Sequence, residues 1–248
     1  SISTNVSITN FALYPSFSYK KLDLWSSTCM FNEIPVGEFS CKGVTFVLPI
    51  EKMEQIKDKE KLSDVIGRLL TSANAFVGPK LSRSHRVVFE IDLPNNEPIF
   101  DEVLYWPVED CDIILNDLNQ PSEKMFNLLS HLLIAEIDTS FLCSEVEATF
   151  SKVASAVALN EQWEDNEFYH IITHNNQKAF NVLLSIALKY GYKPFAAGLK
   201  EVIECPSIKT GYDAWDVFCK AMIRMTDVRM AEIEDLFWEV RKLQGKVS

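Results

Sequence analysis

The sequence predicts an α+β protein in which a β-rich first half with one inserted helix precedes a mainly α-helical second half. Apolar residues alternate with polar ones in two short segments before residue 94, which is the period of a strand with one buried face. Between those segments, and again after residue 119, apolar residues recur at the three- and four-residue spacing of an amphipathic helix. Strands followed by helices, without strict alternation, are typical of the α+β class.

The first half is expected to contain four strands and a helix. The two clearest strands lie at 44–50 and 87–93, where valine, phenylalanine, isoleucine and leucine occupy every second position. Residues 51–71 follow helical spacing and form the inserted amphipathic helix. Weaker strand patterns lie at 102–108 and 112–115, bounded by prolines that favour turns and edges.

The second half is expected to open with a helix capped by Asn119, with Pro121 in its first turn and Glu123 just after. Gly191 marks a helix stop, because glycine favours the left-handed conformation that ends helices. Further helical patterns span 146–159, 178–188, 194–203, 215–225 and 230–243. The chain is expected to divide into a β-rich region at 1–119 and a helical region at 120–248, or to form one continuous domain across both.

The negative charge of the chain is concentrated in its middle third. The formal net charge is −11, yet residues 87–177 hold 18 acidic and 2 basic residues, a net of −16. Residues 1–86 and 178–248 carry +3 and +2. Seven acids and one tryptophan lie in a loop-rich stretch that contains no Lys or Arg. These candidate partner-binding residues are Glu97, Asp101, Glu102, Trp106, Glu109, Asp110, Asp112 and Asp117.

Such a surface is complementary to a basic partner, because opposite potentials steer encounter and raise association rates. The leading hypothesis is an intracellular interaction protein that neutralises or regulates a basic protein. A toxin-immunity protein and an inhibitor of a nucleic-acid enzyme are examples. The acids would steer the encounter, and Trp106 would form a desolvated anchor. An acidic surface that only aids solubility explains the same charge, and a structural or assembly component is a further alternative.

Composition argues against other partners and compartments. Direct nucleic-acid binding is not expected, since the only basic cluster, Lys80, Arg83 and Arg86, is too small to neutralise a run of phosphates. No apolar run approaches the roughly 20 residues of a membrane span. No leader with a basic and then an apolar block is visible, and the six cysteines lack the spacing of a zinc site or a disulfide scaffold. A cytoplasmic protein with reduced, buried cysteines is therefore expected.

One local pattern points to metal chemistry. Glu167, His170 and His174 share one face of a helix, where they could converge on a metal ion. The general-base glutamate of the H-E-x-x-H metalloprotease helix is missing, since Ile171 follows the first histidine. A metal-dependent hydrolase on this face is the alternative function. No cofactor is otherwise expected, because phosphate-loop, dinucleotide and serine-nucleophile motifs are absent from the sequence.

Overall fold

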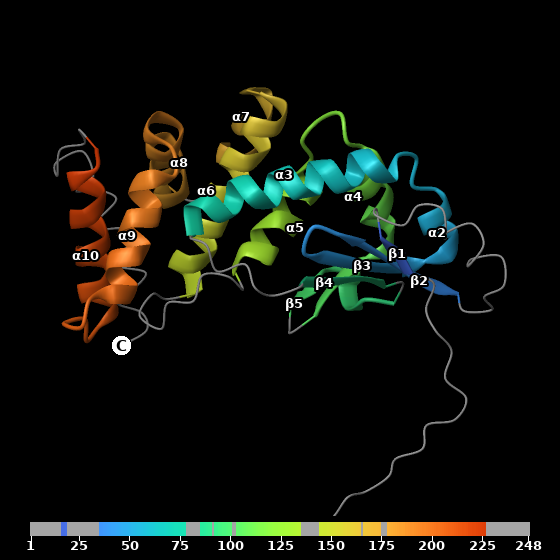
Figure 1. The fold of residues 1–248 in the computed structure, drawn as a ribbon, viewed down its shortest axis with the longest axis horizontal. Helices are drawn as coiled ribbons and strands as arrows, with labels where there is room; N and C mark the ends of the chain where they lie inside the picture. Colours follow the sequence, from blue (N-terminus) through green and yellow to red (C-terminus); the bar gives the residue numbers. More distant parts are fainter. Residues whose placement is uncertain are drawn as a thin grey trace, which may run out of the picture.

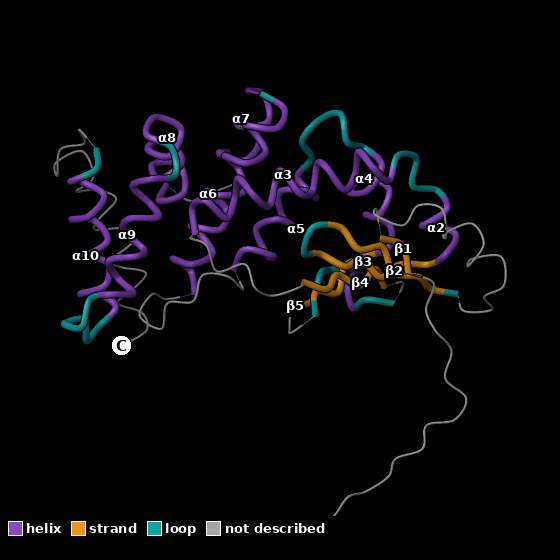
Figure 2. The backbone as a smooth tube through the Cα atoms, in the orientation of Figure 1, coloured by secondary structure: helices purple, strands orange, loops and turns teal. Residues whose placement is uncertain are grey.

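The structure, a computed structural model, describes residues 16–18, 35–77, 85–90, 92–100, 103–134, 144–164, 166–174 and 178–226. The first half forms a mixed sheet, and the second half forms an array of helices that extends away from it (Figure 1, Figure 2). The prediction of an α+β protein with a β-rich first half and a mainly helical second half is confirmed.

The described part of the sheet has six strands in the order β1-β2-β3-β4-β6-β5. Their bounds are Ser16–Ser18 (β1), Val36–Cys41 (β2), Val44–Pro49 (β3), His85–Glu90 (β4), Ile99–Phe100 (β5) and Leu104–Pro107 (β6). Strands β3, β4 and β6 run parallel, whereas β2 is antiparallel to β3 and β5 is antiparallel to β6. Strand β1 is parallel to β2. The carboxyl ends of β3, β4 and β6 therefore meet on one side, which we call the carboxyl end of the sheet.

The two strands with the clearest alternation are confirmed. The segment at 44–50 is β3, and the segment predicted at 87–93 is β4, which ends at Glu90. In β4 the alternation has the expected effect, because Val87 and Phe89 are buried while the residues between and beside them are less so. The strand predicted at 102–108 is confirmed in the shorter form of β6.

The single helix predicted at 51–71 is wrong, because the chain breaks there into two helices. They are α2, Ile50–Glu54, and α3, Lys59–Val77. Asp58 sets the break: its Oδ1 accepts a hydrogen bond from the backbone N–H of Lys61 at 2.8 Å, which starts a new helix. Ile56, in the connection, is buried in the core and holds the break in place.

The strand predicted at 112–115 is also wrong. This segment belongs to helix α4, Cys111–Asn116, which follows the short 3-10 helix η3, Val108–Asp110. Ile114 and Leu115 are both buried although they are adjacent, which a strand with one buried face would not allow. Short apolar runs do not distinguish strand from helix by period alone.

Helix α5 begins four residues later than the predicted cap at Asn119. The Oγ of Ser122 accepts a hydrogen bond from the backbone N–H of Met125 at 3.1 Å, so Ser122 is the N-cap residue. Asn119 instead accepts a hydrogen bond from Lys61 Nζ at 2.7 Å. This contact ties the connection between the two halves to helix α3.

The helical array continues from α5 to α10. Its helices are α5 (Glu123–Ile134), α6 (Ser144–Trp163), α7 (Asn166–His174), α8 (Lys178–Tyr190), α9 (Lys193–Glu204) and α10 (Gly211–Arg224). The predicted stop at Gly191 is confirmed, with a φ of 72° and a hydrogen bond from its N–H to the carbonyl of Ala187 at 2.8 Å. The helix predicted at 230–243 lies outside the described residues.

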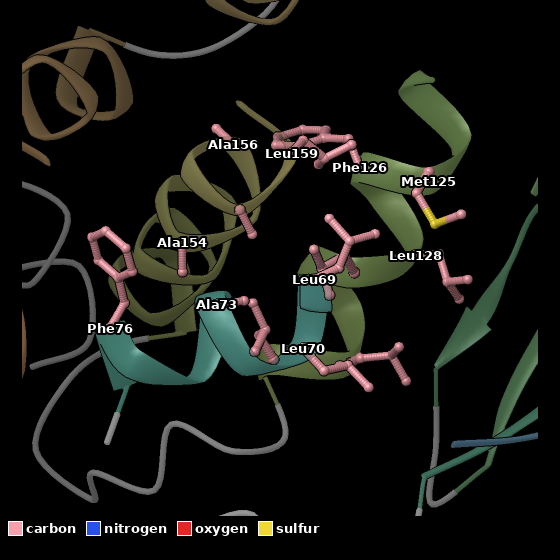
Figure 3. Close-up of a cluster of buried hydrophobic side chains, with 14 of the residues drawn as sticks. Leu69, Leu70, Ala73, Phe76, Met125, Phe126, Leu128, Ala154, Ala156 and Leu159 are labelled. Carbon is pink, nitrogen blue, oxygen red and sulfur yellow. The ribbon is translucent and has the colours of Figure 1, made fainter. Parts of the chain in front are cut away.

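Helix α3 joins the two halves, because it packs on α5, α6 and α9 as well as on β2 (Figure 1). Figure 3 shows the buried contact, in which Leu69 and Ala73 of α3 lie among side chains of α5 and α6. Farther along, the ring of Trp215 stacks on those of Phe150 and Phe218 in a second part of the same core. The division at residue 119 stays a prediction.

Candidate functional site

The topology gathers acidic residues at the carboxyl end of the sheet. Strand β4 leads into a loop with Asp92 and Glu97, and β6 leads into η3 with Glu109. Strand β5 starts at the same end, because it is antiparallel to β6. Asp92, Glu97 and Glu109 are all exposed. Their common position results from parallel strands ending together, which spacing in the sequence alone does not reveal.

Two of the predicted partner-binding acids already pair with residues of this chain, Asp110 in the core and Asp112 at the surface. Asp110 is only 7% exposed, and its Oδ2 lies 3.0 Å from both Trp106 Nε1, which donates a hydrogen bond, and Lys124 Nζ. The Oδ2 of Asp112 accepts a hydrogen bond from Lys52 Nζ at 2.7 Å, and this bond holds the pKa of Asp112 below its ordinary value. The prediction that Asp110 is an exposed binding residue is corrected accordingly.

Trp106 is not an exposed anchor. Its side chain is 1% exposed, pairs with Phe89 across β4 and β6, and meets the ring of His131 edge-on at 6.1 Å between ring centres. A side chain already buried in the core cannot be desolvated again by a partner. Leu104 and Trp106 alternate inward along β6, and this alternation was the sequence signal for burial.

The remaining predicted acids fall into three groups. Glu97 and Glu109 are exposed at the carboxyl end of the sheet. Asp117 is exposed farther along, where its Oδ2 accepts a hydrogen bond from the side-chain amide of Gln120 at 3.2 Å. Asp101 and Glu102 lie outside the described residues. The sequence analysis missed Asp92, which joins Glu97 and Glu109 because of the strand order.

Two exposed isoleucines lie in the elements next to these acids. Ile99 in β5 is 42% exposed, two residues after Glu97, and Ile113 in α4 is 40% exposed. Strand β5 is an edge strand of the described sheet, next to β6. The carboxyl end of the sheet thus combines exposed carboxylates with exposed apolar side chains.

A second candidate site lies on α7. Phe168 and Ile172 are buried and attach the helix to the core, whereas His170 and His174 are on its exposed face. Both histidines line one surface depression of about 650 Å³, together with Ile171, Thr173 and Asn181 of α8. The predicted convergence of the two histidines on one face is therefore present. Glu167 belongs to the same helix, and its side chain lies outside the described residues.

Asn181 connects α8 to the end of α7. Its Nδ2 donates a hydrogen bond to the carbonyl of Thr173 at 3.2 Å, and the hydroxyl of Thr173 donates to the carbonyl of Tyr169 at 2.7 Å. Asn181 Oδ1 is buried, and none of the described residues forms a hydrogen bond with it. Within the described ranges, no group of three His, Cys, Asp or Glu side chains is close enough to hold a metal ion. The three-ligand site with Glu167 stays a prediction.

The basic cluster and the cysteines are further candidates for binding or catalysis. Arg86 of the basic cluster pairs with Glu38 of β2, while Lys80 and Arg83 lie outside the described residues. Burial raises the pKa of Cys41 and Cys111 to about 12, which disfavours the nucleophilic thiolate. The described cysteines are free, and those in β2, α4 and α10 are buried as expected. None of the described helices is long and apolar enough to cross a bilayer.

Comparison with known proteins shows the fold only. Neither a protein family nor a curated protein sequence matches this chain. Among solved structures, the catalytic module of the metalloprotease ZmpA from Clostridium perfringens is similar, with a TM-score of 0.54 at 11% sequence identity. The match covers 94% of this chain and 54% of that module, so the chain spans about half of its length. None of the four histidines here precedes a glutamate, so the chain contains no H-E-x-x-H pattern.

Proposed function

We propose that this protein binds a basic partner protein through the carboxyl end of its sheet and thereby neutralises or regulates it. The observation that carries the proposal is the gathering of exposed acids there. Asp92, Glu97 and Glu109 come from a segment with a net charge of −16 and follow strands that end side by side. Like charges held close together create a negative potential and repel one another. An oppositely charged surface is attracted by that potential and relieves the repulsion.

Some residues next to these acids are already paired within the chain. Basic residues of the first third already face α4 and the connection after it: Lys52 pairs with Asp112, and Lys61 donates to Asn119. The exposed acids next to β4, β5 and β6 hold negative charge at the protein surface. In place of the buried Trp106, we propose Ile99 and Ile113 as the apolar contacts that a partner would desolvate. A basic toxin or nuclease is the class of partner that this charge fits.

A matched pair of triple variants tests the proposal. The first variant, Asp92→Asn, Glu97→Gln and Glu109→Gln, removes three charges at the carboxyl end of the sheet. The second, Asp64→Asn, Glu201→Gln and Glu204→Gln, removes three charges from surface ion pairs of α3 and α9 and leaves the same net charge. Both variants and the native protein would be used to capture partners from host lysate at low salt and at about 0.5 M salt, where screening is nearly complete.

The native protein and the α3/α9 variant are expected to retain the same basic protein at low salt, and the first variant to lose it. With that partner purified, the first variant should associate about 10-fold more slowly and with a weaker salt dependence, because steering is lost. Equal capture by all three proteins would refute the proposal.

A metal-dependent hydrolase on α7 is the second candidate function. The fold likeness to a metalloprotease catalytic module favours it, together with the shared depression at His170 and His174. Glu167 would be the third ligand in this candidate site. The test is peptide hydrolysis by zinc-loaded protein with and without chelator, beside elemental analysis of the native protein and of His174→Ala. Chelator-insensitive or absent hydrolysis would rule it out.

A further inference from the structure

We infer that α7 carries a chelating site for a borderline transition-metal ion, formed by the imidazoles of His170 and His174. The site needs only these two protein ligands, and water or a donor from a bound molecule completes the coordination. It goes beyond partner binding at the sheet, which involves other elements. It also does not require the hydrolase chemistry of the second candidate function.

The spacing of the two residues suits chelation. Side chains four apart on a helix are neighbours, with Cβ atoms about 5–6 Å apart. Imidazole nitrogens bind Zn²⁺ at about 2.0–2.1 Å, so two imidazoles extending from these positions can reach one ion. Imidazole nitrogen, the donor that the two histidines supply to the depression, suits zinc, nickel and copper.

The helix is fixed where the site requires it. Phe168 and Ile172 are buried on the opposite face, so the rotation of α7 about its axis is set by the core. At the end of the helix, Asn181 Nδ2 donates a hydrogen bond to the carbonyl oxygen of Thr173, the residue before His174. A ligand pair held on a packed helix loses less freedom on binding than a pair on a loop.

The depression contains a polar atom that lacks a partner. Asn181 Oδ1 is buried without a hydrogen bond from any residue that the structure describes, and such an atom is rare in folded proteins. Asn181 lines the same depression as the two histidines. A water molecule on the ion would supply a donor to this oxygen, as polar groups outside the ligands commonly do around metal sites. We therefore assign Asn181 a positioning role, with the two histidines as the ligands.

The test is titration of tag-free protein with ZnCl₂ and, separately, NiCl₂ in a calorimeter. The native chain should bind one ion per molecule. His170→Ala and His174→Ala should each weaken binding by about 10-fold or more, because a single remaining ligand loses the advantage of chelation. Ile171→Ala is the matched control, since it lies between the two histidines on the same exposed face and leaves the chelate intact.

Because both histidines are exposed, their replacement should leave the fold unchanged, and circular dichroism checks this. Metal should also raise the melting temperature of the native chain and of Ile171→Ala but not of His174→Ala, because binding to the folded state stabilises it. No binding at about 1 mM metal, or unchanged binding in the double variant H170A/H174A, would overturn the inference. Binding without hydrolysis would sustain the site and reject the hydrolase. Partner capture by His174→Ala should match that of the native chain.

Discussion

Replacement of Asp110 by alanine should destabilise the protein strongly, although the residue belongs to the acidic segment. Its Oδ2 accepts a hydrogen bond from Trp106 Nε1 at 3.0 Å, inside a core where the tryptophan is 1% exposed. Removing this acceptor from a buried N–H costs about 1–3 kcal/mol. The ion pair with Lys124, which is half exposed, adds only about 0–1 kcal/mol after screening by solvent.

The sum is about 1–4 kcal/mol, which for a chain of 248 residues lowers the melting temperature by about 2–16 °C, at about 2–4 °C per kcal/mol. Asp110→Asn keeps an acceptor oxygen and should lose less than half as much. Asp117→Ala is the control, because this exposed acid bonds only a surface amide, and its replacement should change stability by less than about 0.5 kcal/mol.

A double-mutant cycle with Trp106→Phe isolates the hydrogen bond. Phenylalanine has no N–H to leave unpaired, so Asp110→Ala should destabilise the Trp106→Phe protein less than the native one. The difference should be about 1–2 kcal/mol by thermal or urea unfolding. Equal melting temperatures for Asp110→Ala and Asp117→Ala would refute the assignment of Asp110 to the core. A double-mutant cycle without coupling energy would refute it as well.

Two further predictions concern pH and packing. Burial lowers the pKa of His131, so the folded protein binds fewer protons than the unfolded chain below about pH 6.5, and stability falls from there as pH decreases. His131→Gln should reduce that fall between about pH 7.5 and 5.5 in urea unfolding, and an equal fall would contradict it. Gly198→Ala should lower the melting temperature, because a Cβ would lie 2.5 Å from Phe218, whose ring is held in the aromatic core, and overpacking costs about 1–3 kcal/mol. The atoms nearest to a Cβ at Gly67 belong to the flexible side chain of Lys42, and alanine gains up to about 1 kcal/mol of helix propensity, so Gly67→Ala should raise the melting temperature. A change of the same sign in both variants would contradict the packing argument.

Periodicity in the sequence predicted elements where one face is buried and no side chain interrupts the pattern. Strand β4 and helix α9 are examples, because Val87 and Phe89 in the strand and Phe195, Leu199 and Val202 in the helix are buried. Element ends were harder to predict, since single capping side chains decide them. Asp58 splits a helical pattern, Ser122 delays α5, and Thr210 forms a capping box with Asp213 that starts α10 four residues before the predicted point.

The candidate site was only partly predictable, for a related reason. The histidine pair on α7 follows from local helical geometry, which spacing contains. The acids depend on tertiary neighbours: Asp110 is drawn into the core by an indole N–H, and Asp112 is paired with Lys52, 60 residues away in the sequence. Asp92 joins the site only because β4 and β6 are adjacent and parallel. No local pattern encodes those contacts.

The acids of the middle third therefore divide into two groups with opposite consequences. Asp110 is buried and accepts a hydrogen bond from Trp106, so its loss should affect unfolding more than association, whereas Asp112 pairs with Lys52 at the surface. Glu97 and Glu109 extend from the carboxyl end of the sheet, where removing repulsion should leave stability unchanged or slightly raised while association with a basic partner slows. A surface that served only solubility would give no such separation, because every exposed acid would contribute alike to net charge. Measuring stability and association rate in the same variants would therefore distinguish a binding surface from a merely acidic one.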